Sequence, residues 1–173
     1  MTRSIAVFCG ARPVKEVYMN DAYEVGKLIA ERTHTLVYGG GANGLMGKVY
    51  EGASEGGGKI VWVIPRFLIG HQKEWVIDPT KAEIIEVATM DERKKIIFDR
   101  SDTVLMLPGW VGTLDEFFEA MSLVQLWQIN HQLGILNTAG FYDELISQIN
   151  KMTEGGFLPQ KSQDWLFIEE TPT

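Results

Sequence analysis

The sequence has few of the residues on which several common kinds of protein site depend. Its 173 residues include one cysteine, Cys9, and three histidines. A single cysteine excludes an internal disulfide framework and a zinc site built on several thiolates. The histidines, at positions 34, 71 and 131, are widely spaced and have no clustered carboxylate partner, so we expect no metal site. No Gly-x-Ser-x-Gly nucleophile elbow is present, and Cys9 is expected to be a small buried hydrophobe.

Long apolar stretches and an excess of positive charge are also absent. No apolar run approaches the roughly 20 residues that a membrane-spanning helix needs, and we expect no secretory signal at the N-terminus. Lys and Arg number 16 against 23 Asp and Glu, which gives a formal net charge of −7. A nucleic-acid surface needs clustered positive charge. We therefore expect a cytoplasmic protein that binds neither membranes nor nucleic acids.

What the sequence does contain is a regular alternation of strand and helix patterns. Hydrophobic residues make up 45% of the chain, enough for a sizeable core. Seven apolar runs rich in β-branched residues are expected to be strands: Ile5–Cys9, Thr35–Tyr38, Lys59–Ile64, Glu83–Ala88, Thr103–Leu107, Gly134–Asn137 and Trp165–Ile168. Helical spacing of apolar residues marks Tyr23–Arg32, Thr113–Ile129 and Tyr142–Met152. Strands that alternate with helices indicate a doubly wound α/β fold with a mostly parallel sheet, in a single domain spanning residues 1–173.

A glycine-rich segment, Tyr38–Gly47, follows the second expected strand and opens a helix. Glycines let a backbone approach an anion closely, and a helix start supplies unpaired N–H groups. The segment lacks the Gly-Lys-Ser/Thr of a P-loop, and it does not follow the first strand, as a dinucleotide-binding fingerprint would. Two interpretations therefore stay open: a phosphate-binding loop, or a tight strand-to-helix turn.

A second segment, Thr89–Lys95, places basic residues at a helix start. Thr89 and Glu92 form a Thr-x-x-Glu capping box, which begins a helix directly after the preceding strand. Arg93 then lies close to the edge of the sheet where ligands bind in this fold class. Cations at a helix N-terminus oppose its dipole, so these residues are either ligand-binding or a solvated basic face.

A third segment, Pro108–Glu116, follows the strand Thr103–Leu107 and starts the longest helix. Gly112 and Thr113 at the helix start offer backbone N–H groups and a hydroxyl to an anion. Thr113 and Glu116 again fit a capping box. Glu116 is therefore either a helix cap or a carboxylate about one turn above a phosphate site.

These three segments, in this order, resemble the LOG ("Lonely guy") family of cytokinin riboside 5′-monophosphate phosphoribohydrolases, which are often labelled lysine decarboxylases. The specific marks are Tyr38–Gly47, Met90-x-x-Arg93-Lys94 and the Pro-Gly-Gly-x-Gly-Thr-x-x-Glu pattern over Pro108–Glu116, and the likeness covers nearly the whole chain. The resemblance implies a Rossmann-like fold, a homodimer and hydrolysis of the N-glycosidic bond of cytokinin nucleotides or AMP, without cofactor or metal. A lysine decarboxylase would need pyridoxal phosphate, and no lysine stands out as a Schiff-base residue.

The resemblance also implies roles for individual residues. Arg93 and Glu116 would be the catalytic pair, and Gly112 and Thr113 would hold the 5′-phosphate. The other implied substrate-binding residues are Glu74 (which aligns only after a small length adjustment), Lys94, Gly109, Trp110, Val111 and Ser122. The expected phosphate loop consists of Gly40, Gly41 and Gly44.

The chain departs from the family pattern at Trp110, where the family has glycine, and at Ala11, where it has serine. Glycine permits a positive φ and a close phosphate approach, which tryptophan does not. Either the loop adopts an ordinary conformation with the indole pointing away, or the indole occupies the pocket and alters or blocks the substrate. The alternative to an enzyme is thus a nucleotide-binding homologue with lost or altered catalysis.

Overall fold

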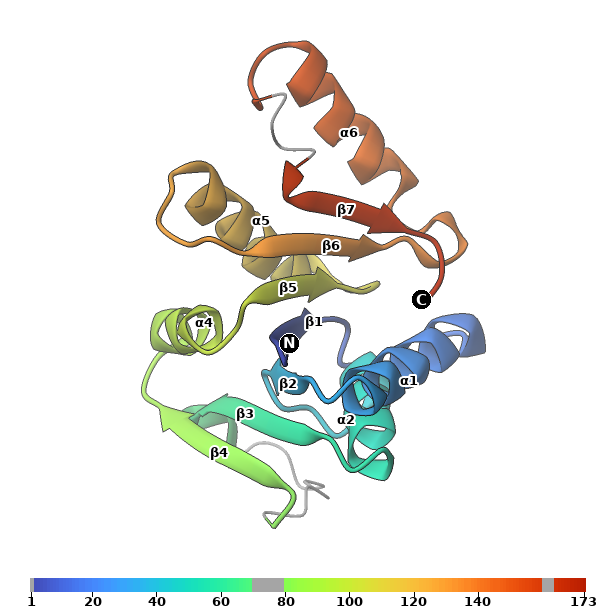
Figure 1. Cartoon of the computed structure of the whole chain (residues 1–173), viewed down its shortest axis with the longest axis vertical. Helices are drawn as coiled ribbons and strands as arrows, with labels where there is room; N and C mark the ends of the chain where they lie inside the picture. The colour runs from blue at the N-terminus through green and yellow to red at the C-terminus, as the bar shows by residue number, and fades with distance from the viewer. Residues whose placement is uncertain (1, 70–79, 160–163) are drawn as a thin grey trace.

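Seven strands form one sheet in the computed structural model, which describes residues 2–69, 80–159 and 164–173 (Figure 1). The strands are β1 Ser4–Phe8, β2 Thr35–Tyr38, β3 Lys59–Pro65, β4 Ala82–Val87, β5 Thr103–Met106, β6 Gln132–Leu136 and β7 Leu166–Glu169. Their order is β4-β3-β2-β1-β5-β6-β7, and each neighbouring pair is parallel. The expected α/β fold is confirmed, and each strand's bounds lie within two residues of those predicted.

Helices cover both faces of this sheet (Figure 1). They are α1 Glu16–Glu31, α2 Gly44–Glu55, the short α3 Arg66–Ile69, α4 Met90–Asp99, α5 Val111–Gln125 and α6 Asp143–Glu154. Side chains alternate between the faces along each strand, so neighbouring residues serve different cores. In β1, Val7 packs in the core with α1 and α2, and Ala6 packs in the core with α4, α5 and α6. This arrangement is the double winding that the sequence predicted.

The contact between α1 and α2 is unusually close because a glycine of each helix lies against the backbone of the other. A Cβ placed on Gly26 would lie 2.1 Å from the carbonyl oxygen of Val49, and one on Gly52 would lie 2.1 Å from that of Tyr23. No side chain fits at either position without moving a backbone. The two helices therefore form a tight pair that supports the loops after β1 and β2.

Two helices differ from the prediction at their ends. Helix α1 begins at Glu16, about two turns before the predicted Tyr23, because Tyr18, Met19 and Ala22 extend its apolar face. Helix α5 ends at Gln125, although the apolar pattern continues to Ile129. Trp127 has φ +56°, a left-handed conformation that stops the helix.

The strand order reverses at β1: β2 to β4 follow one another on one side of it, and β5 to β7 on the other. In open α/β sheets the ligand crevice lies at such a switch point, beyond the C-terminal ends of the strands. The loops after β1, β2 and β5 reach this edge, and they carry two of the three motif segments. Of the helices in the described part of the chain, none is long and apolar enough to span a bilayer.

Candidate active site

The loops at the C-terminal ends of β1, β2 and β5 are tied together through their backbones. Gly10 N, after β1, donates a hydrogen bond to Pro108 O, after β5, at 3.0 Å. Gly10 O accepts one from Leu45 N, at the start of α2, at 2.9 Å. Tyr142 Oη donates to Leu107 O at 2.8 Å and so fixes the end of β5. These bonds give the candidate site a rigid floor.

Helix α4 brings Arg93 to the same edge of the sheet. Thr89 Oγ1 accepts a hydrogen bond from Glu92 N at 3.1 Å, and Glu92 Oε2 accepts one from Ala88 N at 2.8 Å, so the predicted cap is confirmed. Arg93, the next residue, points inward and is only 6% exposed. The solvated-face interpretation is therefore wrong for Arg93, although it holds for the exposed Lys95.

Arg93 and Glu116 meet in a buried ion pair. The distance from Arg93 Nη1 to Glu116 Oε1 is 3.2 Å, and each side chain is 7% exposed. Gly39 leaves room for the guanidinium, because a Cβ at that position would lie 1.5 Å from Arg93 Nη2. Glu116 does not cap its helix, since α5 begins at Val111, five residues earlier, and the carboxylate contacts Arg93 instead. The structure thus brings together the two residues that the resemblance pairs.

Burial controls the ionisation of this pair. It raises the pKa of Glu116 to about 7, although the charge of Arg93 opposes that rise. Burial also lowers the pKa of the Arg93 guanidinium, against the influence of Glu116. A carboxyl group that titrates near neutral pH is typical of catalytic acids and bases. Glu116 can therefore stabilise positive charge or exchange a proton.

Two buried polar atoms of the site have no hydrogen-bond partner among the residues that the structure describes: Arg93 Nε and Thr113 Oγ1. Thr113 lies in the first turn of α5, where free N–H groups and the helix dipole favour an anion. Buried polar groups are normally paired. Thr113 Oγ1 is therefore a donor at the start of α5 that an acceptor oxygen could satisfy.

Trp110 takes an ordinary extended conformation, with φ −106° and ψ −168°, so the loop does not need glycine's positive φ here. Its indole is 70% exposed and turns over Gly112, where a Cβ would lie 3.0 Å from the indole Nε1. Val111 beside it is also exposed, and Gly109 is half-buried. Of the two alternatives for this loop, the ordinary backbone is the one observed.

The other predicted substrate residues have varied surroundings. Lys94 is held between two carboxylates of α5, Asp115 at 3.0 Å and Glu119. The exposed Ser122 donates to a carbonyl one turn earlier in α5 at 2.8 Å. Glu74 lies outside the described residues. The substrate-binding roles of these residues stay predictions.

The glycine-rich loop has the predicted strand–loop–helix arrangement, and α2 begins at Gly44. Gly40 and Gly44 have φ values of +68° and +61°, which explains why glycine occupies both positions. Gly41 between them is buried. Phosphate binding by this loop stays a prediction.

Some supporting residues were not foreseen. Gly39 was expected only as part of the glycine-rich loop, and Tyr142 only as the first residue of a helix, whereas its hydroxyl donates to Leu107 O at the end of β5. The sequence does carry a signal for Asp115 and Glu119 as partners of Lys94, because acidic residues four apart share one helix face. Across residues 2–69, 80–159 and 164–173, no three metal-ligating side chains lie close enough to hold a metal ion.

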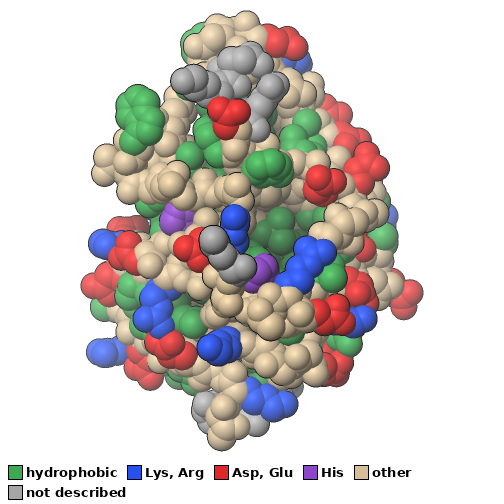
Figure 2. Space-filling view, in the orientation of Figure 1, with side chains coloured by type: hydrophobic (Ala, Val, Ile, Leu, Met, Phe, Trp, Pro, Cys, Tyr) green, Lys and Arg blue, Asp and Glu red, His purple; other side chains and the backbone are tan. Residues whose placement is uncertain are grey.

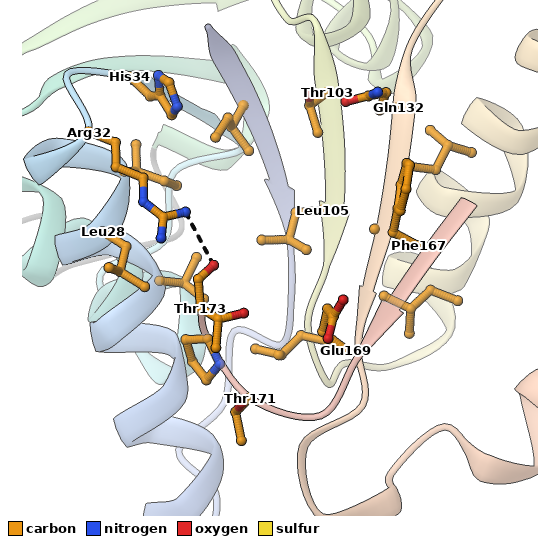
Figure 3. Close-up of a pocket in the computed structure, with 18 residues that line it drawn as sticks. Leu28, Arg32, His34, Thr103, Leu105, Gln132, Phe167, Glu169, Thr171 and Thr173 are labelled. Atoms are coloured by element: carbon orange, nitrogen blue, oxygen red, sulfur yellow. Dashed lines mark hydrogen bonds between the residues drawn. The ribbon is translucent and has the colours of Figure 1, made fainter. Parts of the chain in front are cut away.

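A separate cavity of about 240 Å³ lies between α1 and strands β5 to β7 (Figure 3). Leu28 of α1 and Arg32, directly after the helix, face Leu105 and Phe167 of the sheet across it, and Arg32 Nη1 donates to Thr173 O at 3.2 Å. None of the predicted site residues lines this cavity. It is therefore not part of the candidate active site.

Comparison with known proteins identifies the chain's relatives. A family model described as "Possible lysine decarboxylase" matches residues 46–173. LOGL9 of Oryza sativa subsp. japonica, named a probable cytokinin riboside 5′-monophosphate phosphoribohydrolase, is 41% identical over 167 residues, covering 96% of this chain and 72% of the relative. LOG5 of Arabidopsis thaliana, named a cytokinin riboside 5′-monophosphate phosphoribohydrolase, is 36% identical over 167 residues, with the same coverage of 96% and 72%.

Solved structures extend the likeness of fold. The molybdenum cofactor carrier protein of Chlamydomonas reinhardtii matches with a TM-score of 0.72 at 20% identity, covering 99% of this chain and 92% of the other. At that identity the match concerns the fold alone. The sequence relatives carry more, because they are 36–41% identical to this chain over 96% of its length. On this basis the chain belongs to the LOG family, as its three motif segments predicted.

Proposed function

We propose that this protein hydrolyses the N-glycosidic bond of cytokinin riboside 5′-monophosphates or AMP, releasing the free base and ribose 5-phosphate. The observation that carries the proposal is the buried contact between Arg93 and Glu116 beside the start of α5. Membership of the LOG family, whose plant relatives are named for this reaction, supports the same conclusion.

The proposed reaction replaces the C1′–N9 bond of the nucleotide by a C1′–O bond from water. As the base leaves with the bonding electron pair, the ribose gains oxocarbenium character, which a nearby carboxylate stabilises. Glu116 supplies that carboxylate and accepts a proton from the attacking water. Arg93 balances the negative charge that develops on the base until the base is protonated.

The N-terminus of α5 supplies the proposed phosphate site. Its backbone N–H groups and the Thr113 hydroxyl are available to donate to phosphate oxygens, and the helix dipole favours the charge. Glu116 lies one turn further along the same helix. A nucleotide whose phosphate sits at the helix start therefore has its ribose near the ion pair.

Chromatography of free base after incubation with AMP and N6-isopentenyl-AMP tests the reaction. We expect release by the wild type and a loss of about 100-fold or more in kcat for Glu116→Gln. Glu144→Gln, at an exposed carboxylate in the first turn of α6, is the matched control and should retain wild-type turnover. Saturable binding without release of base would instead support a nucleotide-binding homologue.

Further properties belong to the same proposal. We expect a homodimer, which the exposed Met90 and Val111 at the starts of α4 and α5 favour, and sedimentation should then give twice the chain mass of 19.4 kDa.

Turnover should persist in a metal chelator. Charges of both signs are interspersed on the described part of the face in Figure 2, so we expect no nucleic-acid binding. Cell fractionation tests a cytoplasmic location.

A further inference from the structure

Lys94, the residue after Arg93 in α4, bridges to α5 through two carboxylates. Its Nζ lies 3.0 Å from Asp115 Oδ2 and also contacts Glu119 Oε2. The Lys94 side chain is only 12% exposed, so its ammonium is largely withdrawn from solvent. Burial acts to lower the pKa of Lys94, but its hydrogen bonds to Glu119 and Asp115 outweigh burial and raise that pKa. Lys94 therefore stays charged at neutral pH and tied to α5.

This bridge runs beside the buried ion pair. Arg93 and Lys94 are consecutive in α4. In α5, Glu116 lies between Asp115 and Glu119, which are four residues apart and share one face of the helix. Consecutive helical side chains diverge by about 100°, so Arg93 turns inward to the buried Glu116 while Lys94 reaches the more exposed pair. Two neighbouring cations of α4 thus contact three carboxylates within about one turn of α5.

The Arg93 guanidinium has few contacts of its own that could fix its position. Among the residues that the structure describes, its Nη1 bonds to Glu116 and lies 3.9 Å from Met90 Sδ, and its Nε has no partner. The sulfur contact is weak and lies within α4. A side chain at a reacting centre needs supporting contacts to hold its geometry. The position of Arg93 therefore depends on the position of α4.

The start of α4 is held to α5 by little else. Its first three residues are exposed, and its buried apolar side chains begin at Ile97, about one turn after Arg93. The helix cap bonds to Ala88, within the same segment, and does not reach α5. Within the described part of the chain, Arg93 and Lys94 make the ion pairs from this end of α4 to α5.

We propose that Lys94 is a positioning residue: its tie to the two carboxylates of α5 holds Arg93 against Glu116. The inference rests on the function proposed above and adds a supporting residue to it. This role differs from the contact with substrate that the family resemblance implies for Lys94. Because the tie acts on the geometry of the reacting groups, its loss should slow the reaction without weakening the binding of a sugar phosphate.

The division between rate and binding tests this role. Lys94→Met removes the charge and keeps most of the side-chain length, and we expect kcat for base release to fall about tenfold or more. Inhibition by ribose 5-phosphate should stay within about twofold of wild type, and Lys94→Arg should recover part of the rate. Lys95→Met is the matched control, because the exposed Lys95 pairs with Asp99 of its own helix, and it should keep wild-type kcat.

Two results with Lys94→Met would each overturn the proposal. One is an unchanged kcat. The other is inhibition by ribose 5-phosphate that is about tenfold weaker, which would mean that Lys94 binds the substrate itself.

Breaking the tie from the side of α5 is an independent test. The double variant Asp115→Asn with Glu119→Gln leaves Lys94 in place, and on the level part of its pH profile it should lose as much kcat as Lys94→Met. Adding Lys94→Met to this variant should cause no further loss, because the three residues act through one contact. Additive losses would contradict the proposed tie.

A crystal structure of Lys94→Met gives a readout that needs no turnover. We expect Arg93 to lie beyond hydrogen-bond distance of Glu116 in this variant, and a retained contact would overturn the proposal. If the wild type releases base from neither nucleotide, the proposed function fails, and this structure still decides the role of Lys94.

Discussion

The ionisation of Glu116 connects a single residue's surroundings to the rate of the proposed reaction. Because burial raises its pKa to about 7, the carboxylate is lost as the pH falls through neutrality. We expect kcat/KM for base release to be level above this pKa and to fall about tenfold per pH unit below it. A profile that stays flat between about pH 5.5 and 8 would contradict a role for the ionised Glu116.

The same raised pKa predicts how stability depends on pH. The folded protein holds the Glu116 proton more tightly than the unfolded chain, where the pKa is near its ordinary value of 4.5. The resulting stabilisation is complete below pH 4.5 and is lost as the pH rises through about 7. Across this window the free energy of unfolding should fall by about 3 kcal/mol relative to Glu116→Gln. Urea titrations of both proteins at several pH values measure this difference, and parallel curves would contradict it.

At this scale the sequence could name the important residues but not their partners. The pattern Thr113-x-x-Glu116 fitted a helix cap as well as a ligand carboxylate, because both need the same residue types at the same spacing. The contact that distinguishes the two roles is with Arg93, which reaches Glu116 from a different helix. Local spacing carries no information on that contact, and only the family resemblance pointed to it.

At the scale of the element, Gly39, directly after β2, leaves room for the Arg93 guanidinium. Gly39→Ala would place a Cβ 1.5 Å from the present position of Arg93 Nη2 and so displace the side chain from Glu116. We expect a loss of about tenfold or more in kcat/KM for base release. Gly134→Ala in β6 is a matched control, because its nearest neighbour is the movable Leu105 side chain at 3.0 Å. Wild-type turnover by a folded Gly39→Ala protein would refute this account.

The pair of helices α1 and α2 should be sensitive to a single methyl group. Gly26→Ala would bring a Cβ to 2.1 Å from the Val49 carbonyl oxygen, which belongs to a backbone and not to a movable side chain. We expect the free energy of unfolding to fall by about 1–3 kcal/mol. The midpoint of a urea titration measures this, with Glu24→Ala at an exposed position of α1 as the control. Equal midpoints for the two variants would show that the helices can separate without cost.

Whole elements were easier to predict than their ends. Apolar runs rich in β-branched residues located the seven strands of the described sheet. Most of these runs are continuous, because strands covered on both faces need apolar residues at every position. The predicted end of α5 at Ile129 was wrong because the apolar spacing continues past Gln125. The left-handed conformation of Trp127, which stops the helix, leaves no signal in the side-chain pattern. The tight contact of α1 and α2 was equally hidden, because a glycine inside a helix does not reveal what lies against it.

At the scale of the whole molecule, β1 joins the two halves of the sheet. It pairs with β2 on one side and with β5 on the other, and the loops beyond these three strands build the site. We propose that the chain is a single domain and unfolds as one cooperative unit. Far-UV circular dichroism and tryptophan fluorescence should therefore give one coincident urea transition. Two separate transitions would contradict this, and would indicate that one half of the sheet survives without the other.

The orphaned donors at Arg93 Nε and Thr113 Oγ1 also affect how substrates can be found. A ligand that binds only the folded protein stabilises it by mass action, so an occupied protein should melt at a higher temperature than an empty one. A panel of phosphorylated sugars and nucleotides could then be ranked by the rise in melting temperature alone. Such a screen requires no turnover, so it would identify tight non-reacting compounds as readily as true substrates.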